Sequence, residues 1–177
     1  MKKILIVVDM QNDFVDGALG TKEAAAIVPA VAQKIKDFAG DEIIVTYDTH
    51  FENYLNTLEG KNLPVPHCIE GTAGHELNPD VKNALARKNY REVKKYTFGT
   101  FNIVRELKER YPFDEMEFEL IGLCTDICVG SNALILRAGY PNAKISVDAA
   151  CCAGVTPETH LAALRTMQCC QIDVTNL

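Results

Sequence analysis

The sequence predicts an α/β protein built on a doubly wound, mostly parallel sheet of five or six strands, with helices on both faces. Three observations favour this class. Apolar, β-branched segments alternate with helical patterns along the chain. The strand segments are apolar almost throughout, which is typical of strands buried on both faces of a parallel sheet. The helical segments also carry their own start and stop signals.

Six segments are predicted strands. The first two are KILIVVD at residues 3–9 and EIIVTYD at 42–48, and REVKK at 91–95 is a short third strand. The remaining three are FELIGL at 118–123, KISVD at 144–148 and QIDVT at 171–175. Their apolar, β-branched composition and short length favour strands over helices.

Helical patterns occupy the intervals, at about residues 22–39, 78–87, 101–110, 127–139 and 157–168. Gly139 is a stop signal for the fourth helix. Thr156 is a good N-cap for the fifth, with Pro157 in its first turn. The stretch 49–77 has no clear periodicity, and connections of this length are usually functional loops.

Length and composition limit the class of protein further. The 177 residues, 47% hydrophobic and 24% charged, predict one soluble domain over residues 1–177. The net charge of −6 argues against nucleic acid or an anionic membrane as partner, and no apolar run is long enough to span a membrane. The opening segment meets Asp9 where a signal peptide needs small residues. We therefore expect a cytoplasmic protein whose seven cysteines are reduced and mostly buried.

Reactive side chains follow several of the strand segments. Ligands bind beyond the carboxyl ends of parallel strands, so these side chains should share one rim of the sheet. The candidates are Asp9, Asp48, His50, Lys94 or Lys95, Cys124 and Cys128. Asp9 could deprotonate a thiol, or it could only cap the turn after its strand.

Cys124 and Cys128 lie four positions apart in GLCTDICVG, and three interpretations compete. A metal clamp lacks further ligands nearby, and a redox pair normally has two intervening residues rather than three. With Asp126 as N-cap, Cys128 falls in the first helical turn, where the helix dipole lowers the pKa of a thiol. We favour one nucleophile with a neighbouring cysteine, and two inert buried cysteines remain the alternative.

A metal site is predicted from the end of the second strand. Asp48 and His50 have the D-x-H spacing that points two ligands in one direction. His67 and Glu59 could complete a site suited to zinc, manganese or iron. We expect the remaining candidates to have structural roles: Cys68 as a buried thiol, and His75 and His160 as surface or capping residues.

Four motifs together resemble the isochorismatase-like cysteine hydrolase superfamily, over nearly the whole chain. They are VVDMQNDFVDGALG, KKYTFGTF, GLCTDICVGSNALILRAGY and VDAACCAGVTPETHLAALRTM. The resemblance implies that Cys128 attacks an amide carbonyl, that Asp9 is the general base and later the acid, and that Lys95 stabilises their charges. It also implies an oxyanion hole formed by the backbone N–H groups of Cys128 and Cys124, set by a cis peptide bond between Leu123 and Cys124.

Within this superfamily the chain most resembles the nicotinamidase/pyrazinamidase branch. That branch uses one divalent metal ion, and the resemblance maps its ligands onto Asp48, His50, His67 and Glu59, with zinc as the first choice. The branch commonly stacks a tryptophan on the substrate ring, but this chain has none. The remaining candidates for ring contacts are Phe14, Tyr54 and Phe98.

The implied function is release of ammonia from a small carboxamide, nicotinamide in the first place, through a thioester. A metal-independent isochorismatase-like or carbamoyl-amide hydrolase is the alternative in the same class. A non-catalytic binding protein on the same fold is the alternative from another class. The resemblance also implies a homo-oligomer.

Overall fold

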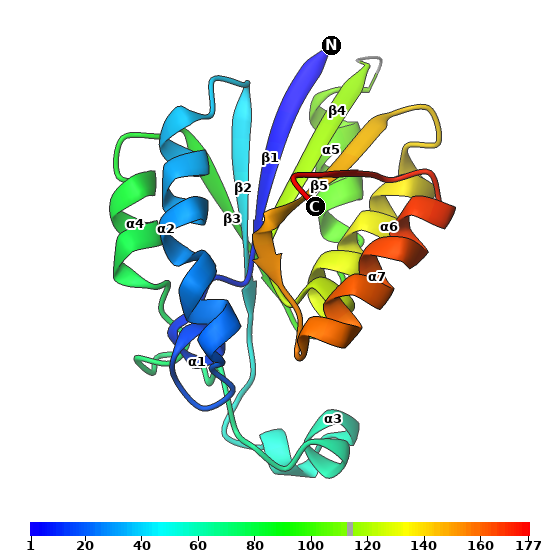
Figure 1. Cartoon of the computed structure of the whole chain (residues 1–177). Coiled ribbons are helices and arrows are strands. Elements are labelled where there is room, and N and C mark those ends of the chain that lie inside the picture. Colours follow the sequence, from blue (N-terminus) through cyan, green and yellow to red (C-terminus); the bar gives the residue numbers. More distant parts are fainter. Residues whose placement is uncertain (113–114) are drawn as a thin grey trace.

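The structure, a computed structural model that describes residues 1–112 and 115–177, is built around one six-stranded sheet (Figure 1). The strands are β1 (Lys2–Val8), β2 (Glu42–Asp48), β3 (Tyr90–Lys95), β4 (Met116–Leu123), β5 (Lys144–Ala153) and β6 (Asp173–Thr175). Their order is β3-β2-β1-β4-β5-β6, and every neighbouring pair is parallel. The predicted fold class is confirmed.

Helices cover both faces of the sheet (Figure 1). One face packs against α1 (Asn12–Val15), α2 (Lys22–Asp37) and α4 (Pro79–Leu85), and the other against α5 (Asn102–Arg110), α6 (Gly130–Gly139) and α7 (Pro157–Cys169). The start signal of α7 is confirmed, since the Thr156 side chain forms a capping box. No helix among the described residues is long and apolar enough to cross a membrane.

Strand β1 shows why the strand segments are apolar throughout. Ile4, Ile6 and Val8 point into the core beneath α5, α6 and α7. Leu5 and Val7 point into the core beneath α2 and α4. A central parallel strand therefore buries both of its faces, and only apolar side chains satisfy both cores.

The sheet reverses its winding between β1 and β4. Val8 pairs with Thr46 of β2 on one side and with Gly122 of β4 on the other. A Cβ at Gly122 would lie 2.1 Å from the Val8 carbonyl oxygen, so only glycine permits this approach. In open α/β sheets, such a reversal opens a crevice at the carboxyl ends of the strands.

Several local details differ from the sequence prediction. Strand β5 was predicted to end at residue 148 but continues to Ala153, and most of the residues beyond 148 are buried. The long stretch 49–77 contains two short helices, η1 (Tyr54–Asn56) and α3 (Leu58–Asn62). A π-helical turn, η2 (Thr125–Val129), precedes α6. Its N-cap is Cys124 rather than Asp126, so the predicted cap was wrong.

The cysteines and one histidine complete the comparison. All seven cysteines, which lie within the described part of the chain, are free, and four of them are buried. His75 was predicted to be a surface or capping residue, but it is buried, and its Nε2 lies 3.0 Å from the Thr49 hydroxyl. That prediction was wrong because a loop far from β2 in sequence folds back over the end of β2.

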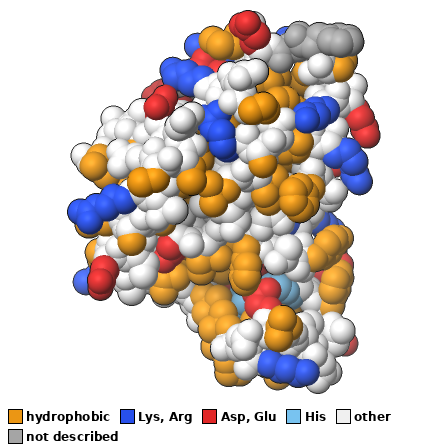
Figure 2. Space-filling view, turned by 90° about the vertical axis from the view of Figure 1, so that its right-hand side faces the viewer, with side chains coloured by type: hydrophobic (Ala, Val, Ile, Leu, Met, Phe, Trp, Pro, Cys, Tyr) orange, Lys and Arg blue, Asp and Glu red, His pale blue; other side chains and the backbone are white. Residues whose placement is uncertain are grey.

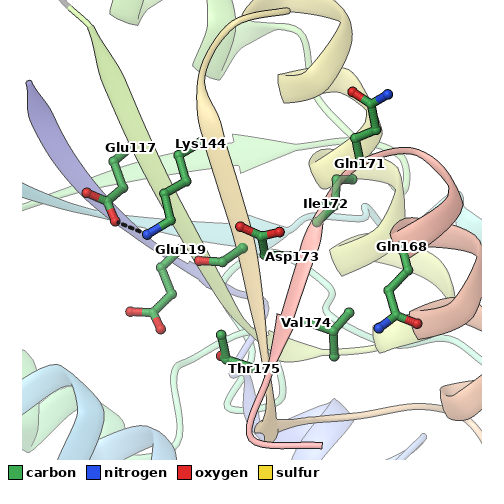
Figure 3. Close-up of a pocket in the computed structure, with 10 residues that line it drawn as sticks. Glu117, Glu119, Lys144, Gln168, Gln171, Ile172, Asp173, Val174 and Thr175 are labelled. Atoms are coloured by element: carbon green, nitrogen blue, oxygen red, sulfur yellow. Dashed lines mark hydrogen bonds and ion pairs between the residues drawn. The ribbon is translucent and has the colours of Figure 1, made fainter.

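A groove of about 630 Å³ runs along β4, β5 and β6 (Figure 3). Most of its lining side chains are polar, and two of its acidic side chains are paired with lysines. Lys144 Nζ lies 3.1 Å from Glu117 Oε1, and Lys34 Nζ lies 2.9 Å from Glu119 Oε1. Such ion pairs are ordinary on a solvent-exposed face of a sheet. The reactive side chains predicted from the sequence do not line this groove.

Candidate active site

Four parallel strands deliver four reactive side chains to one place. Asp9 directly follows β1, Asp48 ends β2 and Lys95 ends β3. Cys128 lies in η2, the turn that follows β4. The rim predicted from the strand ends is therefore present, at the point where the sheet reverses its winding.

Lys95 is the centre of this cluster. Its Nζ lies 2.7 Å from Asp9 Oδ2, 3.1 Å from Asp48 Oδ1 and 3.4 Å from Cys128 Sγ. Burial alone would lower the pKa of the lysine, but the surrounding Asp9, Cys128 and Asp48 raise that pKa well above its usual value. Lys95 is therefore a permanent cation among acidic groups.

The neighbouring Lys94 has a different environment. Its side chain is exposed, and its Nζ lies 2.5 Å from Glu70 Oε1. Successive residues of a strand point to opposite sides, so only one of these two lysines can reach the cluster. Lys95 is the lysine that lies in the cluster.

Asp9 is held in one orientation. The hydroxyl of Thr46 donates to Asp9 Oδ1 over 2.7 Å, and the Asp9 backbone N–H donates to that same hydroxyl oxygen. Asp9 also has a left-handed backbone with φ +48°, which is uncommon for a residue other than glycine. Burial raises the pKa of Asp9, and the ammonium of Lys95 opposes that rise.

Thr46 is not among the site residues that the sequence predicts. A signal was nevertheless available, because Thr46 precedes Asp48 by two positions in a strand. Residues two apart in a strand point to the same side, so a polar residue there should face the same rim.

Cys128 is buried, and its thiol is protonated at rest. Burial raises the pKa of this thiol well above its usual value, Asp9 adds to the rise, and Lys95 opposes it. The direction is opposite to the lowering that the sequence predicts from a helix terminus, because loss of solvent is the largest influence on the pKa of this buried thiol.

The turn before Cys128 has an unusual backbone. The peptide bond between Leu123 and Cys124 is cis, as the resemblance implied. The N–H groups of Ile127 and Val129 both donate to the Cys124 carbonyl oxygen, which closes the turn. This π-helical geometry is rare in proteins and is frequently found at functional sites.

A second cluster adjoins the first through Asp48. Asp48, His50, Glu59 and His67 each offer one ligand atom, and these four atoms lie within 4.8 Å of one another. Asp48 Oδ2 lies 3.1 Å from His50 Nε2 and 3.5 Å from His67 Nε2. Glu59 Oε1 lies 3.5 Å and 3.7 Å from the same two nitrogens.

Four of the six separations between these ligand atoms are close to those around a tetrahedral divalent metal. At bond lengths of about 2.0–2.1 Å, tetrahedral ligand atoms lie roughly 3.3–3.4 Å apart, which falls within the four separations above. The Nδ1 of His67 lies 2.8 Å from the Val65 carbonyl oxygen, so its Nε2 is left for the metal. All four predicted ligands are thus brought together.

Without a metal, the cluster holds a proton. Burial disfavours a charged His50, but hydrogen bonds to Asp48 and Glu59 outweigh burial and raise its pKa to about 9. A bound cation would replace that proton, because metal ligands must be deprotonated.

A cavity of about 270 Å³ joins the two clusters. Its polar wall includes Cys128 and His67, and the rest is mostly apolar. The lining residues are Phe14, Leu19, Thr21, Ala24, Asp48, Glu59, Leu63, His67, Phe98, Cys124, Ile127, Cys128, Gly154 and Val155. Figure 2 shows histidine and acidic side chains in a hollow of this face, with hydrophobic side chains around it. A cavity of ~150 Å³ admits benzene, so this one has room for a small aromatic ring with a substituent.

The three predicted ring contacts have different positions. Phe14 and Phe98 line the cavity. Tyr54 is only 1% exposed and is not among the described residues that line the cavity. Its ring packs edge-on against His50 and His67, and its hydroxyl donates to the Leu63 carbonyl. Tyr54 therefore supports the two histidines from behind.

Comparisons with known proteins agree with this fold. The isochorismatase domain family matches residues 3–177. The nicotinamidase/pyrazinamidase of Mycobacterium tuberculosis is 28% identical, with 97% of each chain covered. An uncharacterized isochorismatase family protein of Bacillus subtilis is 33% identical, covering 73% of this chain and 75% of its own length.

Solved structures of the same group superpose closely. A nicotinamidase/pyrazinamidase of Bacillus subtilis matches with a TM-score of 0.84 and 29% identity, covering 98% of this chain and 99% of its own. A pyrazinamidase of Pyrococcus horikoshii, solved in complex with zinc, matches with a TM-score of 0.79 and 26% identity over the whole of both chains.

Together the fold, the site and these matches define a hydrolase with a doubly wound α/β architecture. The chain belongs to the isochorismatase family, in its nicotinamidase/pyrazinamidase branch.

Proposed function

We propose that this protein is an amidohydrolase that converts nicotinamide and water into nicotinate and ammonia. The observation that carries the proposal is the shared cavity. Cys128, with Asp9 and Lys95 behind it, and the metal-ligand group open into the same space of about 270 Å³. A pyridine carboxamide offers a carbonyl carbon to the thiol and a ring nitrogen to a metal.

The first half of the reaction forms a thioester. Asp9 takes the proton of the Cys128 thiol, and the sulfur attacks the carboxamide carbon. The N–H groups of Cys124 and Cys128 bind the oxyanion. Asp9 then gives its proton to the amide nitrogen, the C–N bond breaks and ammonia leaves. A thiol that is neutral before the reaction is consistent with these steps, because Asp9 must then remove its proton as the sulfur attacks.

The second half releases the acid. Asp9 removes a proton from a water molecule, which attacks the thioester carbon. The C–S bond then breaks, Asp9 returns its proton to the Cys128 sulfur, and the acid leaves as nicotinate after losing its own proton to solvent. Lys95 stays protonated throughout and stabilises each negative charge that forms on Asp9 or on the sulfur. Its burial and its pKa, held well above the usual value, support this role.

We propose zinc as the divalent metal, held by Asp48, His50, Glu59 and His67. When bound, the zinc ion would act as a Lewis acid that binds and orients the pyridine nitrogen. Phe14 and Phe98 are proposed to contact the ring in place of the tryptophan that the chain lacks. Tyr54 is assigned to support of the histidines and not to the substrate.

We also propose that residues 1–177 form one domain that assembles as a homo-oligomer in the cytoplasm. Several large apolar side chains remain exposed, which supports an assembly. They include Leu58, Tyr96 and Phe101. Exposed apolar side chains mark protein interfaces where they gather into a patch.

Ammonia release from nicotinamide by the purified protein tests the proposal, with metal content determined on the same sample. We expect release together with about one zinc per chain, and no release by a Cys128→Ala control. Release without metal would favour the metal-independent hydrolase. A Cys128 thiol that resists alkylation, together with no release, would favour the binding protein.

A further inference from the structure

His160 of α7 forms a hydrogen bond with the turn that carries Cys128. Its Nδ1 lies 2.7 Å from the Thr125 hydroxyl. Thr125 is fully buried and directly follows Cys124. The sequence predicts a surface or capping histidine here, and the structure shows a half-buried side chain because α7 packs against η2. None of the reaction steps above uses His160.

The neighbouring residue of the turn is tied to the same segment. Both carboxylate oxygens of Asp126 lie 3.2 Å from the Val155 backbone N–H, just before α7. Gly154 leaves room for this packing, since a Cβ there would lie 2.9 Å from the Cβ of His160. Two successive side chains of η2 are therefore bonded to the region where α7 begins. Thr125 bonds to the side chain of His160, and Asp126 bonds to the backbone of Val155.

We propose that His160 is a positioning residue for the catalytic turn, acting through the Thr125 hydroxyl. The inference rests on the proposed function, because it concerns the backbone N–H groups that would bind the oxyanion. Thr125 lies between Cys124 and Cys128, which carry these N–H groups. Fixing its side chain fixes the direction of the peptide groups around it, and small displacements of such donors are costly to catalysis.

The ring is suited to a fixed polar contact. Burial lowers the pKa of His160, against the influence of Asp126, so the imidazole is neutral at pH 7. A neutral imidazole forms the bond in either tautomer, with Nδ1 as acceptor or donor. An asparagine places its amide group at nearly the same distance from Cβ as Nδ1, so His160→Asn is the matched conservative variant.

Steady-state turnover of nicotinamide tests the inference. We expect His160→Ala and Thr125→Val each to lower kcat by about tenfold, the scale of one lost hydrogen bond in an active site, with KM little changed. His160→Asn should recover most of kcat. The double variant His160→Ala/Thr125→Val should be no slower than either single variant, because both remove the same bond. A rise in KM at constant kcat, an additive double variant or an asparagine no better than alanine would overturn the inference.

Amide hydrogen exchange of residues 124–129 separates this inference from the proposed function, since it needs no substrate. Exchange in this turn should be roughly tenfold faster in His160→Ala and should return towards wild type in His160→Asn. Unchanged exchange in the alanine variant would overturn the positioning role. If the wild-type protein releases no ammonia from nicotinamide, the proposed function fails, and the exchange rates still decide whether His160 holds the turn.

Discussion

Replacement of Lys95 by methionine should destabilise the fold and abolish catalysis. The side chains of Lys95 and Asp9 are both 0% exposed, and Nζ lies 2.7 Å from Oδ2. Methionine fills much of the same volume but leaves the carboxylate buried without its cation. Breaking one partner of a buried ion pair costs about 3–5 kcal/mol, a large part of the stability of a typical domain.

A second substitution separates stability from activity. In the double variant Asp9→Asn/Lys95→Met, neither charge of this pair remains, and Asp48 keeps His50 at 3.1 Å as its partner. A buried pair replaced by neutral groups is often close to neutral in stability. We therefore expect the double variant to recover most of the lost free energy of unfolding. Ammonia release should stay absent, because both the base and the cation are gone.

The pH dependence of the single variant follows from Asp9. Burial already raises the pKa of this carboxyl, and the variant removes the ammonium that opposes the rise. A carboxyl with a raised pKa in the folded state binds more protons when folded, so stability falls as pH rises between its unfolded and folded pKa values. The loss of stability in Lys95→Met should therefore be larger at pH 8 than at pH 5.

Urea unfolding followed by circular dichroism measures these free energies at both pH values. Lys94→Ala is the matched control, because it removes an exposed cation next along the strand and should change stability by less than about 1 kcal/mol. A Lys95→Met protein as stable as the control would refute the reasoning. So would a double variant no more stable than the single one.

Three further outcomes are expected. Cys128→Ala should lose turnover in the ammonia assay while Lys94→Ala keeps it, and turnover near the wild-type rate in Cys128→Ala would remove the nucleophile assignment. His67→Ala should purify with little metal by elemental analysis, whereas an unchanged metal content would exclude His67 as a ligand. Thr46→Val removes the hydroxyl that orients Asp9 and should lower kcat by at least about tenfold, the scale of a hydrogen bond to a charged group. Thr46→Ser should keep most of the activity, and equal rates for the valine and wild-type proteins would contradict the orienting role.

Much of the fold and of the catalytic cluster could be predicted from the sequence. The strands were recognisable because a central parallel strand is buried on both faces, as β1 is, and so must be apolar throughout. Asp9 and Asp48 were recognisable because each ends such a strand. The carboxyl ends of parallel strands meet at one edge, so residues far apart along the chain could be assigned to one place.

The tertiary structure decided how each side chain is used. The sequence could not show that burial raises the pKa of the Cys128 thiol, or that Tyr54 packs behind the histidines instead of facing the cavity. It also could not show that His160 reaches Thr125. The spacing of apolar residues indicates whether a segment forms a strand or a helix, and which of its faces is apolar. Burial, by contrast, is the sum over all segments that pack around an atom, and such segments come together only in the folded chain.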